Sequence, residues 1–562
     1  MATYVNNLRL KEIATGDESG TWGTSTNTNL ELIGEALGYN TQDCFSSDAD
    51  ATTTVADGST DPARALYFKV TSSATLSATR TLTIAPNTVS RVMVIENATT
   101  GSQSINISQG SGANVTITTG QVRVVYLDGA GSGAAVVDSF TDLGLSGTTT
   151  TAALTVSGNL SVDGGTIKLD GNYPTGTGNV ALGDTALDSI QSDGNYNVAI
   201  GRNAATATTT GDNNIAIGNS SFDANTTGSG NVAVGGDALG ANTTASNNTA
   251  VGTSALLSNT TGIQNNAFGS GALDANTTGN YNVAIGYVAL GANTTASGNV
   301  GIGYASLFDN TTGANNTAIG FSSLENNTTA SNNTAVGYNA LLTNTTGNEN
   351  VAVGAESLEA NTTGTDNTAV GYQALEANTT AINNTGLGRA ALKANTTGSN
   401  NTAVGYTALF TNTTASHNTA VGDASLQLNT TGTQNTSVGR AALAANTTAN
   451  NNSALGYYAL TANTTGADNT AIGASALGAN TTGTRNTAVG KDAGLSVTTG
   501  DDNTFIGHDS GDAVTTASDN TAVGSYSLTN NTTGASNVAI GYSALESNTT
   551  ADNNTAVGYQ LW

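Results

Sequence analysis

The chain has 562 residues and a formal net charge of −26, with 40 acidic residues against 14 lysines and arginines. This balance, together with the absence of a basic patch, argues against a nucleic-acid-binding protein. The single cysteine, Cys44, excludes an intrachain disulfide and a cysteine-based metal site. No run of 18 apolar residues occurs, so we expect no helical insertion into a membrane.

The first predicted element is a short helix. The segment TNTNLELIGEALG predicts an amphipathic helix that is capped by Asn27 or Asn29. Its apolar face is expected to contain Leu30, Ile33 and Leu37. Before it, the opening MATYVNNLRLKEIATG has no basic region followed by an apolar stretch, so we expect no secretory signal.

The next region, residues 66–140, alternates between apolar and polar side chains. Six short segments show this pattern, and turn residues separate them. They predict a compact antiparallel β domain that can serve as a socket or collar, or as a carbohydrate-binding module. The six segments are LYFKVTSS, TRTLTIAP, SRVMVIEN, QSINISQ, NVTITTG and QVRVVYLDG.

Residues 141–178 are rich in Gly, Ser and Thr and include LTVSG, LSVDG and TIKLDG. They predict a strand-rich neck. From Gly201 to Gly558 a glycine then recurs every 17 residues with no insertion or deletion, and Gly183 begins an earlier copy. An unbroken period of this length is typical of a solenoid, and 17 residues are too few for a helical repeat.

Each repeat, as in NTAVGYQALEANTTAIN, predicts a coil of two short extended segments and two turns. The segment NTAVGY is strand-like, and ALxAN is a weaker extended segment. Coils that stack at about 4.8 Å give a rod on the order of 100 Å long.

Alternation within the strand predicts which side chains lie inside the coil. Val336 and Ile319, one residue before the glycine, and Leu341 and Leu375, four residues after a glycine, are expected to fill a narrow core. The residue before the Val or Ile is nearly always Ala, as in Ala369. We therefore expect a second face of Ala and Gly that packs against copies of itself around an axis, or else a thin strand that faces solvent.

The Asn of each NTT turn recurs at one position of the coil. Stacked amides at that position predict a hydrogen-bonded ladder. NTT also matches the acceptor pattern for N-glycosylation, but the fold already explains its spacing. Residues at this position include Asn259, Asn276, Asn293, Asn310, Asn327 and Asn344.

The stretch from 491 to 517 departs from the repeat because Gly494 and Gly511 replace the usual Leu. Its clustered carboxylates could bind Ca²⁺ or form a glycosidase acid pair, although a structural variant of the coil is the simpler interpretation. We expect no tight metal site, no cofactor and no catalytic residues anywhere in the chain. The five acids are Asp492, Asp501, Asp502, Asp509 and Asp512.

Tyr recurs directly after the period glycine, interrupted by charged residues such as Arg389 and Lys491. This tolerance of charge indicates a solvent-facing rib, and the gaps weaken an interpretation as a row of sugar-stacking rings. The two histidines, His417 and His508, occupy variable positions and are expected to be solvated.

The repeat NTAVGYxALxANTTG resembles the repeats of bacteriophage tail-fibre proteins, over roughly residues 177–562. It is more distantly similar to the xVAIG repeats in the heads of trimeric autotransporter adhesins, which are trimeric parallel β-rolls. The opening LRLKEIATGDESGTWGTSTNTNLELI looks like the start of tail-fibre proteins of marine phages. There this region implies attachment to the virion.

These patterns predict an all-β protein: a parallel β-solenoid of 17-residue coils assembled as a homotrimeric fibre, with a small N-terminal β domain and a short helix. We expect a non-enzymatic virion fibre made in the bacterial cytoplasm. It would be held by a phage tail or baseplate protein at its N-terminus and would serve host adhesion through a host glycan or a separate tip protein. The alternatives are a bacterial adhesin head and a glycan-depolymerising tailspike. The expected domains are 1–65 for attachment, 66–140 for the β domain, 141–178 for the neck and 179–562 for the shaft.

Overall fold

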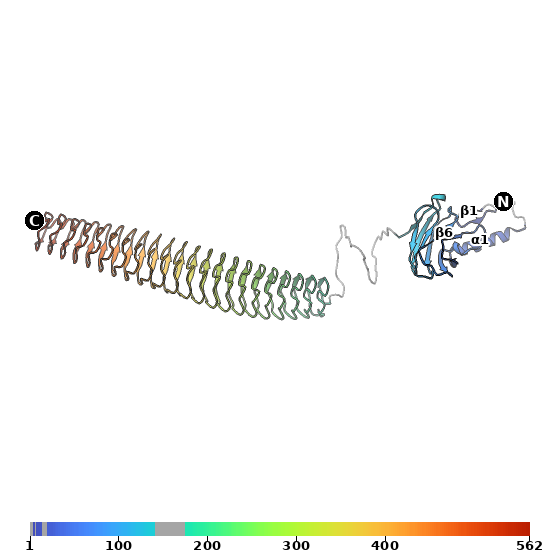
Figure 1. Cartoon of the computed structure of the whole chain (residues 1–562), viewed down its shortest axis with the longest axis horizontal. Coiled ribbons are helices and arrows are strands. Elements are labelled where there is room, and N and C mark those ends of the chain that lie inside the picture. The colour runs from blue at the N-terminus through green and yellow to red at the C-terminus, as the bar shows by residue number, and fades with distance from the viewer. Residues whose placement is uncertain (1–3, 6, 14–19, 141–174, 562) are drawn as a thin grey trace. The chain divides into compact units, whose positions relative to one another are not determined.

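The computed structural model describes residues 4–5, 7–13, 20–140 and 175–561. They form two compact units, one on each side of residues 141–174. Most of the predicted neck therefore lies outside the described residues. The first unit is a two-sheet β domain with a helix, and the second is a β-solenoid (Figure 1).

The first unit begins with a small antiparallel pair and the helix α1, followed by two sheets that enclose an apolar core. One sheet has the strand order β11-β10-β7-β5-β3 and the other β4-β6-β8-β9. The elements are β1 (Tyr4–Val5), β2 (Leu10–Lys11), α1 (Trp22–Ala36), β3 (Tyr39–Phe45), β4 (Ala51–Thr54), η1 (Pro62–Arg64), β5 (Tyr67–Ser72), β6 (Arg80–Ala85), β7 (Ser90–Asn97), β8 (Ile105–Ser108), β9 (Val115–Ile117), β10 (Val122–Asp128), η2 (Gly131–Gly133) and β11 (Val136–Asp138).

The six strands predicted within residues 66–140 are present as β5 to β10, but the expectation of an antiparallel domain is only partly right. The chain passes alternately between the two sheets, so β3, β5 and β7 pair in parallel, as do β4, β6 and β8. Within the two sheets the antiparallel pairs all involve the last three strands: β9 pairs with β8, β10 with β7, and β11 with β10. The domain also starts earlier than predicted, at Tyr39, because the polar strands β3 and β4 carry few apolar residues to reveal them.

The predicted helix exists, but it begins at Trp22, so Asn27 and Asn29 are not its caps. Asn29 lies within the helix, where its side chain bonds to both backbone groups of Lys11. The buried side chains are Leu32 and Ala36, whereas Leu30 and Leu37 are exposed. The face predicted to be apolar and packed is therefore displaced by one residue, about 100° around the helix, from the face that packs.

The second unit is a single 23-stranded parallel sheet in which every strand has three residues. Consecutive strands pair without any shift of register, for example Thr368 with Thr385 and Val370 with Leu387. One strand per coil follows the next along the shaft (Figure 1). The strands are β12 (Val180–Leu182), β13 (Val198–Ile200), β14 (Ile215–Ile217), β15 (Val232–Val234), β16 (Thr249–Val251), β17 (Asn266–Phe268), β18 (Val283–Ile285), β19 (Val300–Ile302), β20 (Thr317–Ile319), β21 (Thr334–Val336), β22 (Val351–Val353), β23 (Thr368–Val370), β24 (Thr385–Leu387), β25 (Thr402–Val404), β26 (Thr419–Val421), β27 (Thr436–Val438), β28 (Ser453–Leu455), β29 (Thr470–Ile472), β30 (Thr487–Val489), β31 (Thr504–Ile506), β32 (Thr521–Val523), β33 (Val538–Ile540) and β34 (Thr555–Val557).

The parallel solenoid is confirmed, but the second extended segment of each coil is not. The ALxAN segment forms tight turns; Leu375 within it has a φ of 52°, and Gln373 just before it has a φ of 57°. The period glycine is required by its backbone, since Gly371 has a φ of 134° and a β-carbon there would lie 2.5 Å from the carbonyl oxygen of Gly388 in the next coil.

The core of the coil contains Ala and Leu rather than Val and Leu. Ala369 in the middle of β23 and Leu375 on the opposite turn are completely buried. Val370, by contrast, is half-buried and points away from the coil. The predicted Ala–Gly outer face is therefore wrong, because Leu leaves room only for a small side chain opposite it: at Gly386 a β-carbon would lie 3.4 Å from Leu375 Cδ1.

Candidate interaction surfaces

The outer face of the 23-stranded sheet runs along the described shaft. The first and third residues of each strand point outward, and they are mostly Thr or Val followed by Val, Ile or Leu. Among the third residues, Ile319, Leu387 and Leu455 are between 38% and 50% exposed. In-register pairing stacks these side chains into one column along the shaft, which gives a half-exposed apolar stripe.

A second column contains the residue after each period glycine. The rings of Tyr287, Tyr304, Phe321 and Tyr338 stack face to face with centroids 4.9–5.7 Å apart. The guanidinium of Arg389 lies over the rings of two neighbouring tyrosines, 5.9 and 5.5 Å from their centroids. The rings of Tyr304 and Phe321 are stacked on both faces by their neighbours, so the faces of those two rings are not free platforms for sugar rings. The column is a solvent-facing rib, as predicted.

The predicted asparagine ladder is present, and apart from the last coil it is buried. Where two consecutive coils both hold the NTT asparagine, the Nδ2 of the later one donates to the Oδ1 of the earlier one, at 2.8 Å between Asn276 and Asn259. A second ladder, which sequence reasoning missed, contains the Asn that precedes each strand; the backbone N–H of Asn384 donates to Asn367 Oδ1 at 3.0 Å. These amides are inaccessible in the folded chain, so the NTT pattern is structural.

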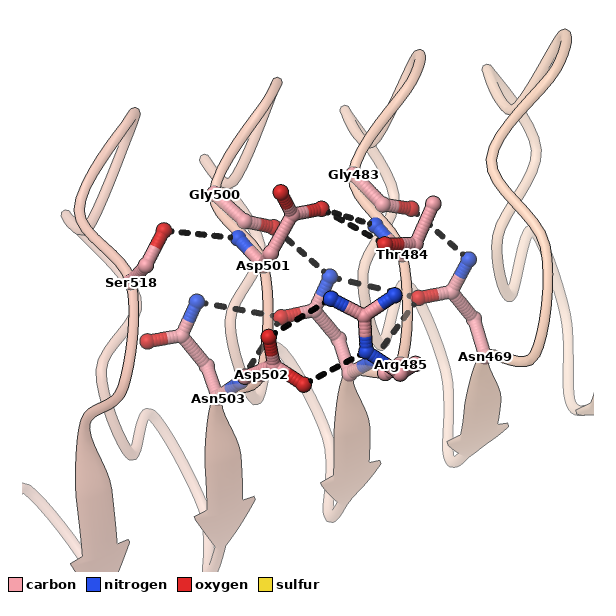
Figure 2. Close-up of polar contacts among 10 residues, drawn as sticks. Asn469, Gly483, Thr484, Arg485, Gly500, Asp501, Asp502, Asn503 and Ser518 are labelled. Carbon is pink, nitrogen blue, oxygen red and sulfur yellow. Dashed lines mark hydrogen bonds and ion pairs between the residues drawn. The ribbon is translucent and has the colours of Figure 1, made fainter.

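The five acids of residues 491–517 do not meet at one site. Asp501 Oδ1 accepts bonds from the backbone N–H and the hydroxyl of Thr484, at 2.6 and 2.8 Å. Asp502 pairs with both Nε and an Nη of Arg485 at 2.7 Å, and this pairing holds the pKa of the Asp502 carboxyl below its usual range. Figure 2 shows these contacts running from coil to coil.

The remaining three acids lie on the other side of the strand. Asp492 pairs with Lys491, and Asp509 lies 3.1 Å from His508 Nδ1. Burial raises the pKa of the Asp512 carboxyl. The acids therefore divide between two turns, and none of them belongs to a group of three or more carboxylates whose oxygens lie within 4.8 Å of one another among the described residues.

The departure from the repeat at 491–517 has a packing cause. Phe505 takes the place of the inward Ala and is completely buried. It fits only because the opposing residues are glycines: a β-carbon would lie 2.7 Å from its ring at Gly494 and 2.3 Å from it at Gly511. Val497 and Val514 extend this apolar insert by replacing two ladder asparagines. This supports the interpretation as a structural variant of the coil.

The one carboxylate cluster among the described residues that could hold a metal consists of Glu356, Glu359 and Glu376, whose oxygens lie within 4.8 Å of one another. Each is already engaged: Gln373 donates to Glu356 at 2.8 Å, Asn339 to Glu359 at 3.1 Å, and Lys393 lies 3.0 Å from Glu376. The cluster borders a groove of about 570 Å³. In the sequence Glu359 and Glu376 are 17 residues apart, which places them in one column, and Glu356 lies three residues before Glu359; this spacing was the available signal. The groove is lined by Leu342, Thr343, Glu359, Ala360, Glu376, Ala377, Lys393, Ala394 and Phe410.

Comparison of the chain with family models, with curated proteins and with solved structures gave no match. In the part of the chain that the structure describes, no helix has the length and apolar character needed to cross a membrane.

Proposed function

We propose that this chain is the shaft of an elongated homotrimeric virion fibre of the phage tail-fibre type, attached through its N-terminal unit and serving host adhesion without enzymatic activity. The observation that carries the proposal is the half-exposed apolar stripe of the 23-stranded sheet. The stripe follows the whole sheet in constant register. A single chain leaves it facing water, whereas parallel copies around a common axis would bury it along the full length.

The repeats also suit a spacer. Every coil bonds to the next through the same backbone contacts, such as the hydrogen bond from Gly371 N–H to Val353 O at 2.8 Å. Each added coil therefore lengthens the shaft by one repeat. Such a rod holds a binding partner away from the surface that carries it. The recognised partner would be a host surface glycan or a separate tip protein, and the carrier a tail or baseplate protein.

Sedimentation of the full chain tests the assembly. We expect a trimer for the unmodified chain and loss of the trimer in the double variant Val370→Asp/Leu387→Asp, because two carboxylates per chain would be buried at the axis without partners. Thr363→Asp/Thr380→Asp is the matched control, since these exposed turn residues lie in the same coils. A monomeric unmodified chain contradicts the proposal.

Two further measurements test the biological role. Cryo-electron microscopy of intact particles is expected to place the chain in a fibre on the virion, and its presence on a bacterial surface instead would favour an adhesin. Release of reducing ends from host polysaccharide by the purified chain would contradict a purely structural role.

A further inference from the structure

The outer face of the five-stranded sheet in the first unit carries a second, separate apolar surface. Strand register places Tyr39 beside Tyr67, Tyr67 beside Val94, and Val94 beside Val124. The neighbouring row contains Val92, Tyr126 and Val137, which pair in the same way across β7, β10 and β11. Together these two rows cross the whole sheet, and we call them the tyrosine–valine face.

This face is exposed in the chain. Val92 and Val137 are each 47% exposed and Tyr126 is 40% exposed. The helix α1 lies mainly against β2 and η1, and although its last residue, Ala36, accepts a bond from Arg91 of β7 at 3.5 Å, these three face residues stay exposed. An apolar patch of β-branched and aromatic side chains that spans five strands is typical of a surface that is buried against a partner.

The polar groups of the face are already satisfied within the chain. The hydroxyl of Tyr67 donates to Glu96 at 3.0 Å, that of Tyr126 lies 2.9 Å from Ser90 Oγ, and that of Tyr39 lies 2.7 Å from Thr41 Oγ1. Burying these rings would therefore leave no hydroxyl without a partner, which removes the main cost of burying tyrosine.

Most of the charges on and around the face lie in ion pairs. Lys69 lies 3.0 Å from Glu96, and at the edge Arg123 lies 3.4 Å from Asp138. The chain as a whole carries −26, so most of its surface would repel a second copy. Beside these pairs the face carries one further charge, the carboxylate of Asp43 on the outward side of β3, so its net charge is far smaller than that of the whole chain.

We propose that the tyrosine–valine face packs against the first unit of a neighbouring copy of this chain. The first units would then assemble with one another, in addition to the assembly of the shafts around their common axis. The proposal rests on the fibre proposed above, because parallel shafts would hold the first units at a high effective concentration. The contact would fix the first units relative to one another.

Cysteine reactivity in the full chain tests this contact. Val92→Cys places a thiol within the face, and Thr52→Cys places one on an exposed position of β4, in the other sheet. The native Cys44 gives little background because burial raises the pKa of its thiol to about 12. At neutral pH we expect the thiol at position 92 to react about tenfold more slowly than the one at position 52, since it is reached only when the contact opens. Adding Val137→Glu should remove this difference by placing an unpaired carboxylate in the contact.

Sedimentation of the same samples separates this proposal from the fibre proposal. A trimer in which both thiols react equally overturns the contact and leaves the shaft assembly standing. A dimer with a protected thiol at position 92 supports the contact and overturns the trimeric shaft. If the thiol at position 92 reacts slowly in a chain that sediments as a monomer, another part of the same chain covers the face. This result would overturn the proposed contact between copies.

Discussion

Each coil of the shaft buries asparagine amides whose partners are supplied by neighbouring coils. Asn378 donates to Asn361 Oδ1 at 2.8 Å and accepts from Asn395 Nδ2 at 3.1 Å. The native chain shows what an interruption does: Val497 follows Asn480 in this column, and Asn480 Oδ1 is buried without a hydrogen-bond partner. An amide ladder therefore stabilises the shaft only while each member has its neighbour.

The substitution Asn378→Val should leave Asn361 Oδ1 in the state of Asn480 Oδ1. We expect a loss of about 1–3 kcal/mol in the free energy of unfolding, the cost of an unpaired buried acceptor. Chemical denaturation measures it. Asn219→Val on the exposed rib is the control and should change stability by less than about 0.5 kcal/mol; an equal effect of the two substitutions would show that the ladder contributes nothing.

At the scale of elements, a polar contact joins the β3–β4 connection to the start of β6 in the first unit. Asp48 accepts a bond from Arg80 Nε at 2.7 Å and another from the backbone N–H of Ser77 at 3.3 Å. Arg80, and then Ser77, hold the pKa of the Asp48 carboxyl well below its usual range. Since the folded pKa is lowered, the contact stabilises above the unfolded pKa of about 4 and its contribution is lost as the pH falls below that value.

Asp48→Asn should therefore lower the melting temperature of the first unit at pH 7. The difference between the variant and the unmodified chain should shrink as the pH falls below about 4, because the Asp48 carboxyl then takes up a proton in the unfolded chain while it is still charged in the folded chain. Calorimetry across this pH range measures the difference. A difference that stays constant with pH would mean that the charge of Asp48 does not contribute.

At the scale of the whole molecule, the two units have separate apolar cores. The first unit encloses residues such as Phe68, Met93 and Ile95 between its sheets, and the shaft has a continuous column of Ala and Leu. Residues that share one apolar core unfold together. Because the two units do not share a core, they should unfold independently.

Scanning calorimetry of the full chain should show two transitions. Asp48→Asn should move only the transition of the first unit, and Asn378→Val only that of the shaft, because each substitution removes contacts within one unit. One common transition that both substitutions shift equally would contradict this independence.

The sequence determined the architecture of the shaft because its period is local and unbroken. The recurring glycine and the stacked NTT asparagines correctly predicted a parallel solenoid with a buried amide ladder. Six strands of the first unit were likewise predicted from alternation. The helix near residue 30 was predicted, but its start and its packed face were not, since Leu30 and Leu32 are both apolar and only the neighbouring elements select one of them.

Only the tertiary structure decided which side chains fill each coil and how the first unit pairs its strands. Alternation places Ala369 and Val370 on opposite faces of the strand but does not show which of them faces inward. The space beside Leu375 determines this, because it admits only a small side chain. Phe505 follows from the same packing constraint. This large side chain fits into the core because Gly494 and Gly511 stand where other coils have Leu. Parallel pairing in the first unit likewise follows from a chain that passes back and forth between two sheets. The apolar and polar pattern within one strand does not show which strand lies beside it.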